Sequence, residues 1–202
     1  MKIHESHNAP NPRRVRIFLA EKNIQVPYEE VDIGKRVNLD EEFRKKNPLG
    51  TVPVLELDDG TFVSESVAIC RYFEELHPQP PLFGTDAKQR ALVEMWNRRM
   101  EFNILQPIAD TFRQRHDFFK GRIRQLPEYA EVQRLNAEDN LAWLDRELGA
   151  HRYIAGDQFS IADITAMVAI DFGRISKIAI KPDQTNLARW HGEVAARPSA
   201  KA

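Results

Sequence analysis

The chain has 202 residues, with 29 lysines and arginines against 30 aspartates and glutamates and a formal net charge of −1. This balance disfavours a broad nucleic-acid-binding surface, which needs a strongly basic face. The single cysteine, Cys70, excludes an intrachain disulfide and a Cys-x-x-Cys redox centre. No apolar run approaches the roughly 18 residues of a membrane span, and the N-terminus lacks the apolar core of a signal peptide. We therefore expect a cytoplasmic protein that binds neither membrane nor nucleic acid.

Residues 1–77 alternate between strand and helix patterns. A short strand over 2–5 precedes a helix that is predicted to begin with Asn11 as N-cap and Pro12 at the first helical position, where these residue types are favoured. The elements expected next are a strand over 28–33, a short charged helix or loop over 39–46, strands over 52–57 and 61–63 joined by a hairpin turn, and a helix over 66–76.

The first helix is predicted to be amphipathic. Val15, Phe18 and Leu19 follow one another at i, i+3 and i+4, which places them on one face that packs against the core. The polar remainder of this helix is three arginines: Arg13, Arg14 and Arg16.

The second part of the chain shows only helical patterns. Three prolines within residues 78–81 cannot continue a helix, so residues 78–85 are predicted to be a stiff linker. Residues 86–202 are predicted to form an all-helical domain. Its helices are expected over 87–119 with a kink at Pro107, over 126–149, over 160–176 as a buried helix, and over 187–196, with Phe118, Phe119, Trp143 and Trp190 in the core.

The step from Val52 to Pro53 opens the strongest strand pattern. A proline there loses a ladder hydrogen bond, so its presence is informative. If the peptide bond is cis, the backbone N–H and C=O of Val52 face outward and can pair with an extended peptide as a strand does. The alternative is a trans proline on an edge strand, which the dipeptide by itself does not exclude.

Two helix starts offer places for anions. Glu65 and Ser66 lie where a strand ends and a buried helix begins, so free N–H groups and the Ser66 hydroxyl suit a carboxylate, while Glu65 suits an ammonium group. Residues 8–13 offer the same helix-start dipole to an anion such as a thiolate. The alternative for both segments is ordinary helix capping, which local sequence favours at Glu65 and Ser66.

Two further patterns point to structure and not to chemistry. Ser160 and Asp163 have the spacing of a capping box, with the serine as N-cap and the aspartate at the third helical position. The six histidines show no metal-ligand spacing with cysteine or acidic residues, so no metal is expected.

Five motifs lie in order along the whole chain: residues 11–22, residues 47–55, residues 64–66 with 68–69, residues 156–163, and Trp190 with residues 197–199. Together they resemble the glutathione S-transferase family in its bacterial, theta- or zeta-like branch. The resemblance implies an α/β thioredoxin-like N-terminal domain, an all-α C-terminal helical bundle domain, a homodimer, and glutathione in a cleft of the first domain.

The resemblance also implies roles for single residues. Val52, before a cis Pro53, pairs its backbone with the cysteinyl part of glutathione, and Glu65 and Ser66 hold the γ-glutamyl end. Asn38 and Thr51 fall where relatives bind the glycine carboxylate.

The thiol-activating residue of the family has no match in this chain. Serine-type relatives carry serine where this chain has Ala9, and the tyrosine of other classes falls near Glu5 or Ser6. Asn11, through its amide N–H, is the remaining candidate for stabilising the thiolate.

The function implied is conjugation of the glutathione thiolate to an electrophilic, partly apolar small molecule, as in detoxification. The second-substrate pocket is expected between the first helix and the long helix that carries Asn103 and Pro107. A non-catalytic glutathione-binding or interaction module on the same fold is the alternative.

Overall fold

The computed structural model describes residues 1–202 and divides the chain into two compact units. Unit 1 comprises Met1–Leu82 with Lys201–Ala202, and unit 2 comprises Phe83–Ala200. The division after Leu82 falls inside the proline-rich segment that the sequence predicts to be a linker.

Unit 1 is built on a four-stranded mixed sheet in the order β2-β1-β3-β4. β1 (Lys2–Glu5) pairs in parallel with β2 (Tyr28–Glu30) and antiparallel with β3 (Val54–Glu56), which forms a hairpin with β4 (Phe62–Ser64). The β-α-β-α-β-β-α order predicted from the sequence is confirmed. The helical elements are α1 (Pro10–Glu21), the 3-10 turn η1 (Val37–Leu39), α2 (Glu41–Lys46) and α3 (Ser66–Leu76).

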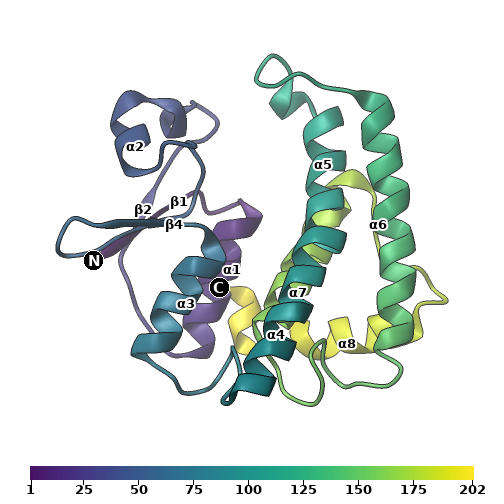
Figure 1. Cartoon of the computed structure of the whole chain (residues 1–202). Helices are drawn as coiled ribbons and strands as arrows, with labels where there is room; N and C mark the ends of the chain where they lie inside the picture. Colours follow the sequence, from purple (N-terminus) through teal and green to yellow (C-terminus); the bar gives the residue numbers. More distant parts are fainter. The chain divides into compact units, whose positions relative to one another are not determined.

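Helices α1 and α3 pack against each other beside the sheet (Figure 1). Their inner faces carry the apolar side chains that the sequence patterns predict: Val15, Phe18 and Leu19 from α1 and Ile69 and Phe73 from α3 are all buried. This arrangement of sheet and helices is the thioredoxin-like fold expected for the first domain.

The start of α1 differs from the prediction. The helix begins at Pro10, and Ala9 is the N-cap residue without a side-chain cap, so the assignment of Asn11 as N-cap is wrong. Both Pro10 and Pro12 fit a first turn, because the N–H groups there have no partner within the helix. The chain therefore enters the helix at the earlier proline, and Asn11 becomes its second residue.

The sequence pattern left three arginines as the polar remainder of α1, but two of the three are buried. Arg14 and Arg16 are buried, with 1% and 8% of their surface exposed. Arg14 lies one turn before Phe18 on the same side of the helix, so it shares the inner face. Hydrogen bonds from Arg14 to Ser66 and from Arg16 to Glu5 and His7 replace part of the water that these guanidinium groups lose.

Unit 2 is all helical, as predicted. The single long helix expected over 87–119 is interrupted by a π-helical segment just before Pro107, which lies in the first turn of the next helix. Proline cannot donate the backbone hydrogen bond that an uninterrupted helix needs at this point. The elements are α4 (Ala87–Met100), the π segment η2 (Glu101–Leu105), α5 (Gln106–Arg115), η3 (Asp117–Phe119), α6 (Pro127–Glu147), α7 (Ile161–Gly173), η4 (Arg174–Ser176), α8 (Thr185–Ala195) and η5 (Pro198–Lys201).

The start of α7 confirms the predicted capping box of Ser160 and Asp163. Asp163 is fully buried and its carboxylate accepts hydrogen bonds from the backbone N–H of Ile154 at 2.9 Å, from the backbone N–H of Ser160 at 2.9 Å, and from the indole N–H of Trp190 at 2.8 Å. One carboxylate therefore joins the loop before α7, the first turn of α7, and α8.

The predicted aromatic core is confirmed only for Trp190. Phe118, Phe119 and Trp143 are half-buried; the two phenylalanines lie in the short 3-10 turn η3. Trp143 instead stacks on Trp96, with ring centroids 5.7 Å apart.

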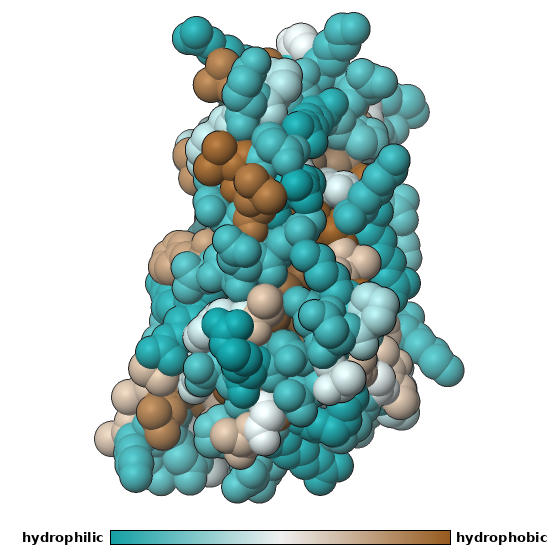
Figure 2. All heavy atoms as spheres, turned by 90° about the vertical axis from the view of Figure 1, so that its right-hand side faces the viewer, coloured by the Kyte–Doolittle hydropathy of each residue, from teal (hydrophilic) through white to brown (hydrophobic).

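Figure 2 shows a face on which hydrophilic side chains predominate and hydrophobic ones form small separate patches. Some apolar side chains are exposed, such as Tyr129, Val132 and Leu135 on α6. Exposed apolar side chains are common on folded proteins, because polar groups cannot cover the whole surface. None of the helices combines the length and the apolar composition that crossing a bilayer requires.

Candidate active site

Three segments of unit 1 meet at one end of the sheet. β1 and β3 are antiparallel, with His4 opposite Val54, so the turn after β1 lies beside the residues that precede β3. β3 and β4 are also antiparallel, with Val54 opposite Ser64, so the residues after β4 lie at this same end. The strand pairing thereby gathers the turn before α1, the Val52-Pro53 step and the Glu65-Ser66 step.

The Val52-Pro53 peptide bond is cis, which confirms the prediction. Pro53 is buried and Val52 half-buried. Val52 lies outside the paired part of β3, so its backbone takes no part in the sheet ladder. An extended peptide could use it in the way that a further strand uses a sheet edge.

Glu65 has a conformation that few non-glycine residues adopt. Its φ is 70° and its ψ is 113°, directly before the first residue of α3. A left-handed conformation of this kind costs on the order of 1–3 kcal/mol and is concentrated at binding and catalytic sites. The side chain is exposed, so a cationic ligand group can reach it.

Ser66 begins α3 and is 4% exposed. Its hydroxyl accepts a hydrogen bond of 2.9 Å from the Nη1 of Arg14, which comes from α1. The start of α3 therefore has a cationic neighbour in addition to its own helix dipole. Sequence reasoning missed Arg14, although its position one turn before Phe18, within the apolar face, is a signal that could have found it.

Asn11 is half-buried, and its side-chain amide makes no hydrogen bond within the chain. It precedes Arg14 by three residues, so the two lie on the same side of α1. Ala9, the N-cap, offers no hydroxyl. The amide of Asn11 and the free N–H groups of the first turn are thus the donors that the start of α1 can present to an anion.

The turn before α1 is held by charged groups. Arg16 donates to the carboxylate of Glu5 at 2.7 Å and to the backbone carbonyl of His7 at 2.8 Å. Ser6 donates its hydroxyl to Glu30 at 3.3 Å, and the N–H of His7 donates to that carboxylate at 3.1 Å. Glu5 and Ser6 are therefore engaged in fixing the turn.

Asn38 in η1 and Thr51 after α2 both lie in the connection between β2 and β3, which side-chain hydrogen bonds stabilise. The amide of Asn38 donates to the carbonyl of Gly50 at 2.6 Å, and the amide of Asn47 donates to the hydroxyl of Thr51 at 2.8 Å and to its carbonyl at 2.9 Å. Asn38 keeps its second N–H, and Thr51 keeps its hydroxyl proton, for a ligand.

Gly50 is the position where this loop depends most on a glycine. Its φ is +63°, and an added Cβ would lie 2.8 Å from the backbone oxygen of Asn38. We expect Gly50→Ala to lower the free energy of unfolding of unit 1 by about 2 kcal/mol, from the left-handed conformation and the clash. Urea titration followed by circular dichroism measures this effect, and Gly60→Ala is the matched control, because its φ is also positive but nothing lies within 4 Å of its added Cβ. Equal losses for both variants would contradict the expectation.

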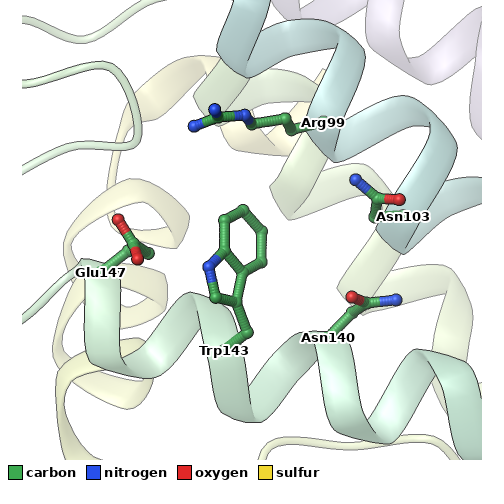
Figure 3. Close-up of a pocket in the computed structure, with 5 residues that line it drawn as sticks. All are labelled: Arg99, Asn103, Asn140, Trp143 and Glu147. Atoms are coloured by element: carbon green, nitrogen blue, oxygen red, sulfur yellow. The ribbon is translucent and has the colours of Figure 1, made fainter.

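Unit 2 contains a cavity of about 460 Å³ between helical segments, lined by Arg99, Asn103, Asn140, Trp143 and Glu147. Figure 3 shows Trp143 extending from α6 into the space below Arg99, with the amides of Asn103 and Asn140 on one side. Of the two residues predicted to contact the second substrate, Asn103 lines this cavity. Pro107 is buried and does not.

The thiol of the single cysteine is unreactive in this structure. Cys70 is fully buried in α3, and burial raises the pKa of its thiol to about 12, against which Arg14 is the main opposing influence. A thiol with that pKa is not a nucleophile at neutral pH. No group of three or more histidine, cysteine, aspartate or glutamate side chains is placed to hold a metal ion.

The fold and the sheet-end site together define a two-domain class, in which a thioredoxin-like domain with a cis-proline turn precedes an all-helical domain. Residues 3–81 match the family model of the glutathione S-transferase N-terminal domain, and residues 108–198 match that of the glutathione S-transferase C-terminal domain. "Glutathione S-transferase 2" of Saccharomyces cerevisiae is 36% identical over 208 residues, which cover 100% of this chain and 88% of the relative.

Solved structures agree. Gtt2 from Saccharomyces cerevisiae superposes with a TM-score of 0.95 at 35% identity, covering 100% of this chain and 99% of that one. A glutathione S-transferase domain-containing protein of Marinobacter aquaeolei VT8 gives a TM-score of 0.94 at 36% identity, covering 98% and 99%. This chain belongs to the glutathione S-transferase family and is a transferase enzyme.

Proposed function

We propose that the sheet-end site of unit 1 binds glutathione and presents its thiolate to an electrophilic, partly apolar small molecule. The observation that carries the proposal is the convergence at one sheet end of the cis Val52-Pro53 step, the strained Glu65 and the buried Ser66. The backbone of Val52 pairs with the cysteinyl residue. Ser66 and Glu65 hold the carboxylate and the ammonium group of the γ-glutamyl residue.

The other end of glutathione is assigned to the loop that contains Asn38 and Thr51. The second N–H of Asn38 and the hydroxyl proton of Thr51 donate to the glycine carboxylate. Both donors are neutral, so this end contributes less to affinity than a charged pair would.

The start of α1 is proposed to stabilise the thiolate. The bound thiol gives its proton to solvent, and its sulfur then attacks the electrophilic carbon, so that an S–C bond forms and the leaving group departs with its electron pair. A hydrogen bond to an anion contributes about 1.5–3 kcal/mol, so the amide of Asn11 lowers the pKa of the bound thiol by about one to two pH units.

This role of Asn11 predicts opposite effects for two variants. Asn11→Ala removes a donor and is expected to raise the pKa of bound glutathione, while Ala9→Ser adds a hydroxyl at the N-cap and is expected to lower it. The rate at neutral pH changes only several-fold, because a more stable thiolate is a poorer nucleophile. Conjugation rate against pH with a generic electrophile measures both. An unchanged thiol pKa in folded Asn11→Ala would remove Asn11 from the mechanism.

Residues 1–77 are the glutathione-binding domain, 78–85 the linker and 86–202 the helical domain, which supplies Asn103 for the second substrate. We also propose a cytoplasmic homodimer of the theta- or zeta-like branch that acts in detoxification without a metal.

A further inference from the structure

Helices α1 and α3 share a buried ladder of paired side chains along their contact, with a polar pair at each end. Arg14, Phe18 and Lys22 follow one another at intervals of four residues on α1, and Ser66, Cys70 and Glu74 do so on α3. The first rung is the hydrogen bond of 2.9 Å from Arg14 to Ser66, and the last is the ion pair of 2.7 Å between Lys22 and Glu74. All six side chains are buried.

The two end rungs have different surroundings. Lys22 is also bound by the backbone carbonyls of His77 and Pro80, at 2.7 Å each, so its charge serves to fix the segment after α3. Arg14 is directed to the opposite end of the ladder, where its partner is the first residue of α3. That residue is also the one proposed to hold the γ-glutamyl carboxylate.

The chemistry of the Arg14–Ser66 contact determines how the serine can act. A guanidinium group is a donor only and stays protonated, so the serine oxygen must accept this hydrogen bond. The hydroxyl proton of Ser66 is then directed to a different acceptor. A donor–acceptor chain of this kind strengthens the outer hydrogen bond, and burial of Arg14 to 1% exposure keeps its charge from being screened by salt.

We propose that Arg14 is a positioning residue for glutathione, which holds the hydroxyl of Ser66 with its proton directed at the γ-glutamyl carboxylate. This inference rests on the proposed function of the sheet-end site. Arg14 acts through Ser66, so its contribution to affinity requires both the serine hydroxyl and the ligand carboxylate. If Arg14 only stabilised the fold, its effect on affinity would depend on neither the serine hydroxyl nor the ligand carboxylate.

The test is a double-mutant cycle on the full-length protein, measured by calorimetry with glutathione. We expect Arg14→Met to weaken binding about tenfold, the effect of losing one hydrogen bond. In the Ser66→Ala background the same substitution is expected to change affinity less than about twofold, because the two residues act as one unit.

A second ligand separates positioning from packing. The second ligand is the glutathione analogue that has hydrogen in place of the γ-glutamyl α-carboxylate. This analogue lacks the acceptor for the Ser66 hydroxyl, so Arg14→Met is expected to leave the affinity for the analogue unchanged. Arg14→Lys keeps a charge and a donor and is expected to recover part of the affinity for glutathione. It also replaces Arg14→Met in the cycle if the methionine variant does not fold.

The matched control is Lys22→Met combined with Glu74→Gln, which removes the other charged rung between the same two helices. Its expected effect is on stability, with glutathione affinity unchanged. If Arg14→Met weakens the binding of both ligands equally, or weakens glutathione binding equally with and without the Ser66 hydroxyl, the proposed role of Arg14 is wrong. The proposed glutathione site would still stand. Wild-type protein that fails to bind glutathione would overturn the proposed function together with the role of Arg14.

Discussion

Asp163→Ala is expected to lower the free energy of unfolding of the helical unit by about 3–5 kcal/mol. The carboxylate is fully buried and accepts the N–H groups of Ile154, Ser160 and Trp190. Removing it leaves these three buried N–H groups without an acceptor, each at a cost of about 1–3 kcal/mol, and the Ser160 hydroxyl also loses its acceptor at 3.1 Å. Part of this cost is offset because the variant no longer has to bury a carboxylate away from water.

Tryptophan fluorescence during urea titration measures this loss. The three tryptophans of the chain, Trp96, Trp143 and Trp190, all lie in unit 2, so their emission reports on that unit. Asp157→Ala is the matched control, since Asp157 is exposed and makes no hydrogen bond or ion pair. Its effect is expected within about 0.5 kcal/mol. Similar losses for the two aspartates would show that the buried contacts of Asp163 contribute little.

The same residue gives unit 2 a pH dependence. Burial raises the pKa of Asp163 from 3.8 to about 6, although the hydrogen bonds from Ile154, Trp190 and Ser160 oppose the change. Between these two values the folded state binds more protons than the unfolded state, so the free energy of unfolding falls as the pH rises from about 4 through 6. At about 1.4 kcal/mol per pH unit, this contribution reaches roughly 3 kcal/mol. Asp163→Asn does not titrate, so its stability profile is expected to lack this slope.

Ser66→Ala is expected to weaken glutathione binding by about 1.5–3 kcal/mol, or about 10- to 150-fold, since its hydroxyl is assigned to a charged carboxylate. The fold is expected to survive, because the substitution removes one hydroxyl at a helix start, although Arg14 loses the acceptor of its 2.9 Å hydrogen bond. Calorimetry on the wild type and the variant decides the outcome.

Ser64→Ala is the matched control for this experiment. Ser64 lies two residues earlier at the end of β4, is half-buried, and makes no side-chain hydrogen bond within the chain. Unchanged affinity in Ser64→Ala together with a loss in Ser66→Ala locates the carboxylate at the helix start. Unchanged affinity in Ser66→Ala would place the γ-glutamyl end elsewhere.

Local patterns in the sequence were sufficient to determine the order of elements in the first part of the chain and the all-helical nature of the second. The helix over 66–76 was predicted to the residue, and the capping box of Ser160 and Asp163 was confirmed, because both depend on residues within one or two turns of each other. The cis Val52-Pro53 bond was predicted from the family motif and not from the dipeptide, since the dipeptide is compatible with either isomer.

The tertiary structure decided which polar residues are buried and what they contact. Arg14 and Ser66 are 52 residues apart, and neither local sequence predicts that the two side chains are hydrogen-bonded. The sequence did not distinguish Pro10 from Pro12 as the start of α1, since both suit a first turn. It also did not show that Trp143 is half-buried while Trp190 is fully buried. Helix periodicity gives the face on which a side chain lies, but a guanidinium group enters the core only where another element brings an acceptor, and that pairing exists only in the folded chain.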